Sequence, residues 1–163
     1  MIQIEGTTRG KGLKFAVIVA RFNDFVTERL QTGALDALKS AGVDEDDICV
    51  IKVPGAFEIP FAAKEAAQRG SFAAIVCLGC LIRGATAHFE YIASAASHGI
   101  IEAAAATGVP MTFGVLTTNS VEEALERAAA GPANKGWEAA IAAVEMATLQ
   151  RKLRERKSDG IKV

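Results

Sequence analysis

The sequence predicts an α/β fold with a mostly parallel sheet, and three observations support this class. Apolar runs rich in Val and Ile alternate along the chain with alanine-rich stretches of helical period. The apolar runs are continuous, which is typical of strands that are buried on both faces. Of the 163 residues, 50% are hydrophobic and 23% are charged, as in one compact domain. We therefore expect a single domain over residues 1–163.

Four strands are expected in chain order. They cover residues 14–20 (KFAVIVA), 48–53 (ICVIKV), 73–78 (AAIVCL) and 110–116 (PMTFGVL). The third apolar run continues to Ile82, so a longer strand is open at that position.

Helices are expected between and after these strands, over residues 24–41, 56–69, 88–106, 120–130 and 134–157. In the first of them, apolar side chains recur at helical spacing and form one stripe. Gly42, Gly70 and Gly108 follow predicted helix ends, where a residue that tolerates left-handed backbone is favoured. The sequence shows no internal repeat, low-complexity stretch or linker, so we expect no domain boundary.

Charge and targeting signals argue against several classes of protein. The 18 basic and 19 acidic residues leave a net charge of -1, which provides no long-range field to attract nucleic acid or an anionic membrane. The start MIQIEGTTRGKG lacks the charged and then apolar order of a secretory signal. No apolar run approaches the length that spans a membrane. We therefore expect a cytoplasmic protein.

Cys77 and Cys80 have the C-x-x-C spacing that redox proteins and zinc sites use. In a strand, however, residues three apart point to opposite faces, so these two thiols could not share a disulfide or a metal ion. The sequence has no second C-x-x-C motif, and the redox motif opens a helix instead of lying in a strand. Buried cysteines are therefore expected.

Ligands of open parallel sheets bind beyond the carboxyl ends of the strands, where loops lead into helix N-termini. The candidate loops are residues 21–23 (RFN), 54–58 (PGAFE), 79–88 (GCLIRGATAH) and 117–119 (TTN), with Phe113 just before the last. The third loop combines glycines, an arginine, a threonine and a histidine, which is more than a turn and a helix cap require. We therefore expect a binding site at this edge of the sheet.

The third loop is a candidate phosphate site. Gly79 and Gly84 have the glycine spacing of a P-loop, but Ala85 and Thr86 stand where Lys and Ser or Thr would follow, so a nucleoside triphosphatase is not expected. Backbone N–H groups from Gly84 to Thr86, at the start of the next helix, suit a single phosphate. A cap of that helix by Thr86 explains the same residues equally well and stays open.

His88 lies in the first turn of the predicted helix beside this loop. Histidine is the side chain whose charge changes near neutral pH, so His88 is a candidate proton carrier. A histidine that only forms a hydrogen bond at a helix start is the alternative. The other histidine of the sequence, His98, lies about 15 Å along the same helix, so the two could not bind one metal ion, and we regard His98 as structural.

Five further residues each have a functional and a structural interpretation. Phe22 and Phe57 could stack on a flat ring or belong to the core, as most phenylalanines do. Glu58 either stabilises a helix N-terminus or accepts hydrogen bonds from ligand hydroxyls. Arg127 and Lys135 flank a break between the last two predicted helices and are either solvated charges or a second contact to phosphate.

The four loops together resemble the 6,7-dimethyl-8-ribityllumazine synthase family. The resemblance rests on ARFN, VPGAFEIP, IRGATAHFEY, FGVLTTN, EEALERA and NKGWEAA, which occur in this order over nearly the whole chain. It implies a three-layer flavodoxin-like sandwich with a four-stranded parallel sheet and helices on both faces. It also implies the condensation of 5-amino-6-(D-ribitylamino)uracil with 3,4-dihydroxy-2-butanone 4-phosphate, the penultimate step of riboflavin biosynthesis, without a metal or cofactor.

The resemblance also implies roles for individual residues. His88 would move protons, and Phe22 would stack on the pyrimidine. The uracil and ribityl parts would be bound by Asn23, Ala56, Phe57, Glu58, Cys80, Leu81, Ile82 and Phe113. The phosphate would be held by Ala85, Thr86, Arg127 and Lys135. Phe113 and Arg127 come from the neighbouring subunit in this family, so a homo-oligomer is implied, commonly a pentamer and in some members an icosahedral capsid of sixty subunits.

The chain departs from the family pattern in two places. Residues 129–131 (AAG) replace a common Gly-Thr-Lys run, so an auxiliary lysine near the phosphate is missing. Ala87 replaces a bulkier residue or proline. In this family an insertion before the last helix tends to accompany free pentamers, and residues 127–134 carry none, although Pro132 is unusual. The alternating start, residues 1–5 (MIQIE), could add an edge strand to a neighbour's sheet.

Two other functions stay open on the residues alone. A non-catalytic flavin- or lumazine-binding protein would need the aromatic pocket but neither His88 nor Arg127. An FMN-dependent electron carrier would need a hydroxyl-rich phosphate loop after the first strand, where this chain has residues 21–24 (RFND).

Overall fold

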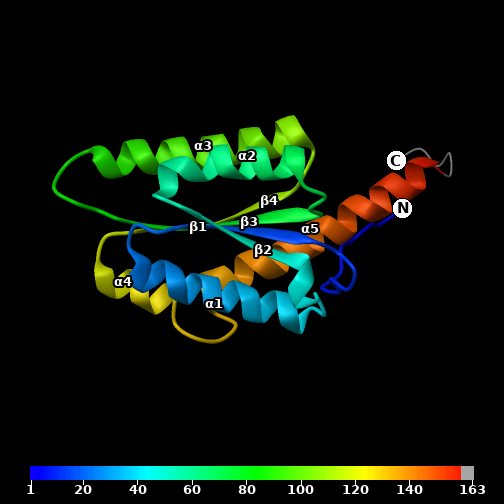
Figure 1. Ribbon diagram of the computed structural model, residues 1–163, viewed down its shortest axis with the longest axis horizontal. Coiled ribbons are helices and arrows are strands. Elements are labelled where there is room, and N and C mark those ends of the chain that lie inside the picture. The colour runs from blue at the N-terminus through cyan, green and yellow to red at the C-terminus, as the bar shows by residue number, and fades with distance from the viewer. Residues whose placement is uncertain (159–163) are drawn as a thin grey trace.

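A single parallel sheet organises the chain in the computed structural model, which describes residues 1–158 (Figure 1). Its strands are β1 (Phe15–Ala20), β2 (Ile48–Val53), β3 (Ala74–Ile82) and β4 (Met111–Thr118), in the spatial order β2-β1-β3-β4. Every pair of neighbouring strands is parallel, so all four carboxyl ends meet at one edge of the sheet. The predicted extension of the third strand to Ile82 is confirmed.

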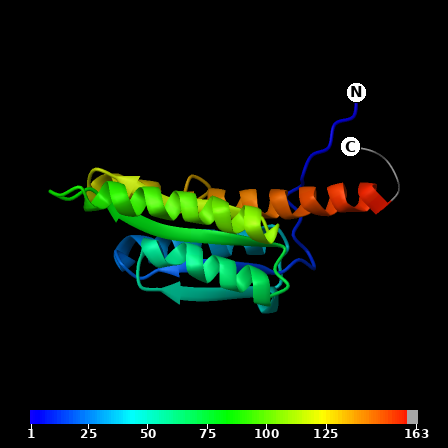
Figure 2. The same ribbon diagram turned by 90° about the horizontal axis from the view of Figure 1, so that it is seen from above.

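Helices cover both faces of this sheet and complete three layers (Figures 1 and 2). The helices are α1 (Asp24–Ser40), α2 (Ile59–Arg69), α3 (His88–Thr107), α4 (Val121–Arg127) and α5 (Lys135–Ser158), with short 3-10 helices η1 (Glu45–Asp47) and η2 (Ala56–Glu58). α2 and α3 pack together on one face, and α1, α4 and α5 lie on the other. The predicted α/β fold with a flavodoxin-like three-layer arrangement is confirmed. The last residues of the predicted domain, 159–163, lie outside the described part of the chain.

The central strand β1 separates two hydrophobic cores, because its side chains alternate between the two faces. Phe15, Val17 and Val19 face the core under α1 and α5. Ala16 and Ile18 face the core under α2 and α3. All six residues of β1 are buried, as predicted from the continuous apolar run.

Burial on both faces is a wrong prediction for the edge strands. In β2, Cys49, Val50 and Lys52 are exposed, because no neighbouring strand and little helical surface cover this edge. In β4, the opposite edge, Phe113 and Thr117 are exposed. An apolar run therefore identified these strands correctly without showing which of them would lie inside the sheet.

The predicted helix over residues 120–130 ends earlier than expected. α4 stops at Arg127, and the carbonyl of Ala128 accepts a hydrogen bond from Asn134 Nδ2 at 2.9 Å instead of from a further helical turn. The predicted helix over 56–69 starts as the 3-10 turn η2 before α2. Gly108 ends α3 in the left-handed region with φ 67°, as expected of a glycine at this position.

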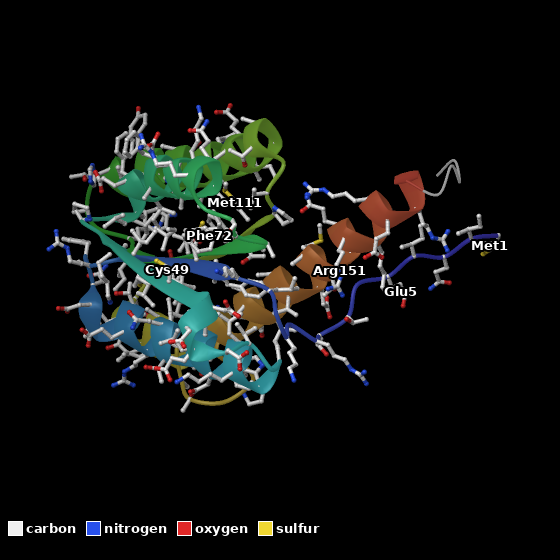
Figure 3. The ribbon with its side chains drawn as sticks, turned by 45° about the vertical axis from the view of Figure 1, so that its right-hand side comes forward. Met1, Glu5, Cys49, Phe72, Met111 and Arg151 are labelled. Atoms are coloured by element: carbon white, nitrogen blue, oxygen red, sulfur yellow. The ribbon has the colours of Figure 1, made fainter. Side chains whose placement is uncertain are left out.

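The first residues of the chain run along the outer half of α5. Thr7 and Thr148 exchange hydrogen bonds at 2.8 and 3.0 Å, and Lys152 Nζ donates to the carbonyl of Glu5 at 2.8 Å. Figure 3 shows Glu5 beside this part of α5 and Met1 further from the sheet. Residues 1–14 form no strand within the described chain. None of the described helices has both the length and the apolar character of a membrane span.

Candidate active site

A cavity of about 620 Å³ opens at the carboxyl ends of β1, β2 and β3. Three of the four loops predicted to bind a ligand line it. The predicted site residues in its wall are Phe22, Ala56, Phe57, Glu58, Cys80, Leu81, Ile82, Thr86 and His88. The cavity therefore lies at the carboxyl ends of the strands, which is the edge of the sheet where a binding site was expected.

Two further lining residues, Phe89 and Ile92, were missed from the sequence. Both lie on α3, and Ile92 is one helical turn beyond His88. Residues four apart share one face of a helix, so the position of His88 contained a signal that pointed to Ile92. Phe89 had no such signal, because its place depends on how the loop enters the helix.

Phe22 and Phe57 place aromatic rings at the cavity without burying them. Phe22 is 68% exposed and Phe57 is 58% exposed, whereas a core phenylalanine such as Phe15 is 0% exposed. Exposed aromatic side chains lose the benefit of apolar burial, so the core interpretation of these two residues is wrong in this chain. Both rings are available to a flat ligand.

Asn23 connects the first and third loops. Its backbone is left-handed with φ 59°, a conformation that asparagine tolerates better than most residues. Its Nδ2 donates a hydrogen bond to the carbonyl of Cys80 at 2.9 Å. This bond fixes the end of β1 against the part of β3 that lines the cavity, although Asn23 itself is not among the lining residues.

The end of β3 leaves backbone groups free for a ligand. β3 pairs with β1 only as far as Leu78, but it pairs with β4 as far as Ile82. The backbone of residues 79–82 therefore has no strand partner on the side of β1. Leu81 and Ile82 line the cavity on this stretch.

Arg83 braces the loop between β3 and α3, which projects beyond the end of the sheet (Figure 1). Its Nε donates to Asn119 Oδ1 at 3.0 Å, and its guanidinium lies 4.5 Å from the centroid of the Phe89 ring. Its Nη1 also donates to Glu90 Oε1. A hydrogen bond from its own backbone N–H, and then the bond from Arg83, keeps the pKa of the Glu90 carboxyl below its usual value. The loop is thus held to both α3 and the segment after β4.

Thr86 does not cap α3. The N-cap residue is Ala87, which makes no side-chain hydrogen bond, and the helix begins at His88. Within the described residues, the backbone N–H groups of Gly84, Ala85 and Thr86 make no hydrogen bond. The helix N-terminus and these donors form the kind of surface that binds an anion. Ala85 is exposed beside the cavity and does not line it.

His88 is exposed at the wall of this cavity, and His98 lies elsewhere. His98 Nδ1 donates to the carbonyl of Ser94 at 2.9 Å within α3. The described residues contain no group of three or more His, Cys, Asp or Glu side chains arranged to hold a metal ion. Of the two histidines, His88 is therefore the one that lies at this cavity, beside the loop and the aromatic rings.

The two cysteines of the C-x-x-C run point to opposite sides of the sheet, as predicted. Cys77 belongs to the core under α2 and α3, and Cys80 belongs to the core under α1 and α5. Burial raises the pKa of Cys77 to about 12 and the pKa of Cys80 to about 11. Both thiols stay protonated at neutral pH, and the prediction of buried cysteines is confirmed for this pair.

Phe113, Arg127 and Lys135 lie at a second, separate cavity. It measures about 460 Å³ and lies along the edge strand β4, α4 and the start of α5. Arg127 Nη1 donates to the carbonyl of Glu123 at 3.2 Å, and Lys135 Nζ pairs with Glu138 Oε2 at 2.7 Å. One chain therefore does not bring these three predicted residues together with His88.

The fold and the first cavity define the class: a flavodoxin-like α/β protein with a cavity at the carboxyl ends of its parallel strands, where ligands of such sheets bind. A family model described as 6,7-dimethyl-8-ribityllumazine synthase matches residues 12–151. The chain is 52% identical over 149 residues to the 6,7-dimethyl-8-ribityllumazine synthase of Syntrophus aciditrophicus (strain SB), covering 91% of this chain and 97% of the relative. It is 50% identical over 146 residues to the protein of the same name in Desulfatibacillum aliphaticivorans, covering 90% and 94%. The chain belongs to the 6,7-dimethyl-8-ribityllumazine synthase family, which confirms the resemblance.

Proposed function

We propose that the protein condenses 5-amino-6-(D-ribitylamino)uracil with 3,4-dihydroxy-2-butanone 4-phosphate to 6,7-dimethyl-8-ribityllumazine, the penultimate step of riboflavin biosynthesis. The observation that carries the proposal is the match to the family over residues 12–151, which includes every loop at the two cavities. The cytoplasmic location expected from the sequence stays a prediction.

The first cavity suits the pyrimidine substrate. The exposed rings of Phe22 and Phe57 offer apolar faces for a flat heterocycle. In residues 79–82, the backbone groups that face the side of β1 have no strand partner there and can offer donors and acceptors, apart from the Cys80 carbonyl, which accepts from Asn23. Glu58 offers a carboxylate to the hydroxyl groups of the ribityl chain. Shape and polarity thus favour a flat ring that carries a polar chain.

The loop before α3 suits the phosphate of the second substrate. The N–H groups of Ala85 and Thr86 stand at the N-terminal end of a 20-residue helix, whose dipole favours negative charge. His88 is two residues further and lines the same cavity as Thr86, so we assign to it the transfer of protons to and from the reacting atoms. In the proposed sequence the 5-amino group of the pyrimidine attacks the ketone, a first water leaves as the imine forms, and phosphate is eliminated. The ribitylamino nitrogen then attacks the remaining carbonyl, and a second water leaves as the ring closes.

The complete site requires a second copy of the chain. We assign Phe113 and Arg127 of one subunit to the first cavity of its neighbour, and Lys135 lies beside Arg127 at the second cavity. The two cavities lie on different parts of the surface. A contact that brings the second cavity of one chain to the first cavity of the next is therefore a head-to-tail contact. Such contacts form a closed ring when the rotation from one subunit to the next closes, and we propose the pentamer that the family resemblance implies.

The test is a direct assay of product formation. The purified protein is mixed with both substrates, and the appearance of the fluorescent lumazine is followed together with the release of phosphate in equal amounts. Omission of either substrate serves as a control. Binding of the pyrimidine without any product from both substrates would contradict the proposal and would identify a non-catalytic binding protein instead.

A further inference from the structure

Asn134 is a buried amide at the start of α5. It is 2% exposed, and all of its hydrogen-bonding positions are used. Its Nδ2 donates to the carbonyl of Ala128 at 2.9 Å and to the carbonyl of Arg29 at 3.1 Å. Its Oδ1 accepts from the N–H groups of Gly136 at 2.8 Å and Trp137 at 3.2 Å. One side chain thus connects α1, the end of α4 and the first turn of α5.

These contacts adjoin the two cations of the second cavity. Ala128 directly follows Arg127, and Gly136 directly follows Lys135. The intervening residues 129–133 (AAGPA) have no polar side chains, so their side chains could not make hydrogen bonds that replace those of Asn134. The amide of Asn134 therefore fixes the backbone immediately beside each cation.

Close packing against α1 gives this connection a rigid base. A Cβ atom at Gly33 would lie 2.4 Å from Asn134 Oδ1, which is closer than non-bonded atoms approach. A Cβ atom at Gly136 would lie 2.0 Å from the carbonyl oxygen of Leu30. Glycine at both positions lets α5 and the amide approach α1, so the start of α5 has little freedom to shift.

We infer that Asn134 is a positioning residue that sets the spacing between Arg127 and Lys135 and so presents both cations to the phosphate of the second substrate. The inference rests on the proposed function, which assigns these cations to phosphate. An ordinary helix cap would need only the bonds that Oδ1 accepts from the first turn of α5. The bonds that Nδ2 donates to Ala128 and Arg29 do not serve the cap, and they hold the end of α4 in place.

The replacement Asn134→Ser separates these two roles. A serine hydroxyl still accepts from the N–H groups of the first turn, so the cap is kept. It is too short to reach the carbonyls of both Ala128 and Arg29. We expect the KM for the phosphorylated substrate to rise by roughly tenfold, because a small misplacement of binding groups weakens a charge-assisted contact. The KM for the pyrimidine should not change, and inorganic phosphate should inhibit the variant less.

Two control variants make the result decisive. Leu38→Ala removes a fully buried side chain of α1 and leaves the amide of Asn134 unchanged. It is therefore a control for the effect of reduced stability alone. It should leave the ratio of the two KM values unchanged. Arg127→Ala tests the phosphate assignment itself and should raise the KM for the phosphorylated substrate more than Asn134→Ser does.

The outcomes are distinguishable. If Arg127→Ala changes the ratio of KM values and Asn134→Ser does not, the positioning role is rejected and the proposed function stands. If Arg127→Ala leaves the ratio unchanged, the assignment of Arg127 to the phosphate is rejected and the positioning role of Asn134 with it, whereas the proposed function itself is rejected only if no product forms. Equal rises of both KM values in Asn134→Ser, or a change of particle mass that accompanies them, would also overturn the positioning role. If Asn134→Ser does not fold, Gly33→Ala, which displaces the amide sterically, is measured in its place under the same criteria.

Discussion

His88 is an exposed ring at the wall of the first cavity, beside the N-terminus of α3. We expect His88→Ala to lower kcat by roughly tenfold to a thousandfold, because proton transfer is one contribution among several. Positioning of a reactive ketone should preserve the remaining activity. Pyrimidine affinity, measured by calorimetry, should stay nearly the same, since the aromatic rings that we propose to contact the pyrimidine are intact. An unchanged kcat would reject the role in proton transfer.

Phe22 allows a test of binding that is separate from stability, because its ring is 68% exposed. We expect Phe22→Ala to raise the KM for the pyrimidine about tenfold or more, in line with the loss of one aromatic stacking contact. The melting temperature should barely change, since little buried surface is lost. Phe61→Ala is the matched control, because Phe61 on α2 is 73% exposed and does not line the cavity. Equal effects of the two variants on KM would argue against stacking.

Cys77 makes the stability of the protein sensitive to alkaline pH. Burial raises its pKa from 9.0 to about 12, so above about pH 9 the native state keeps a proton that the unfolded chain loses. The contribution of Cys77 to the free energy of unfolding is complete below about pH 9. As the pH rises from there to about 12, this free energy falls by about 1.4 kcal/mol per pH unit. We expect Cys77→Ala to make this fall less steep in denaturant unfolding between neutral pH and about pH 11, while Cys80, whose pKa burial raises to about 11, still contributes to it. Cys49→Ala, which removes an exposed thiol, should leave the slope as it is.

At the scale of elements, the loop between β3 and α3 depends on Arg83. We expect Arg83→Met to keep an unbranched side chain while removing the hydrogen bonds to Asn119 and Glu90 and the guanidinium that lies over the Phe89 ring. Hydrogen exchange in the first turn of α3 should become faster, and the KM for the phosphorylated substrate should rise. The free energy of unfolding should change little, because exposed ion pairs contribute only about 0–1 kcal/mol. Unchanged exchange rates would show that the loop is held by its backbone alone.

The elements themselves could be predicted because their signals are local. Each predicted strand and helix is present, since hydrophobic period and helix-stopping glycines depend on neighbouring residues. The exposure of Val50 could not be predicted, because it depends on β2 lying at the edge of the sheet. The early end of α4 could not be predicted either, because a hydrogen bond from Asn134 replaces the next turn.

The candidate site shows the same division. Sheet topology and loop composition predicted the cavity that holds Phe22, Glu58 and His88. The bracing roles of Arg83 and Asn134 were not predicted, because their partners lie far away in the sequence. The proposed role of Arg127 in a neighbour's site came from the resemblance to the family. Neither the sequence pattern nor the structure of a single chain indicates it.

At the scale of the whole molecule, the proposed sharing of one site between two chains makes assembly a condition of activity, because the two cavities of one chain are separate. The first cavity holds the aromatic rings and His88, and the second holds Phe113 and Arg127 on the opposite side of β3 in the sheet order. Dilution below the assembly threshold should therefore remove activity even though each chain stays folded.

The last prediction concerns the size of the assembly. Residues 127–134 carry no insertion, and in the family a short segment at this place tends to accompany icosahedral capsids. Pro132 restricts the backbone of this segment and could set a different angle between pentamers. The first residues run along α5, where the Glu5 carbonyl accepts from Lys152, but Ile2 is 66% exposed, and β2 has an unpaired edge with Val50 38% exposed. We expect residues 1–5 to add a strand to a neighbour's sheet, so their deletion should weaken the pentamer. Light scattering and negative-stain microscopy would show capsids for the full chain, and a particle of pentamer mass at high concentration in phosphate buffer would reject the capsid. A truncated chain that keeps the mass of the full chain on dilution would reject the added strand.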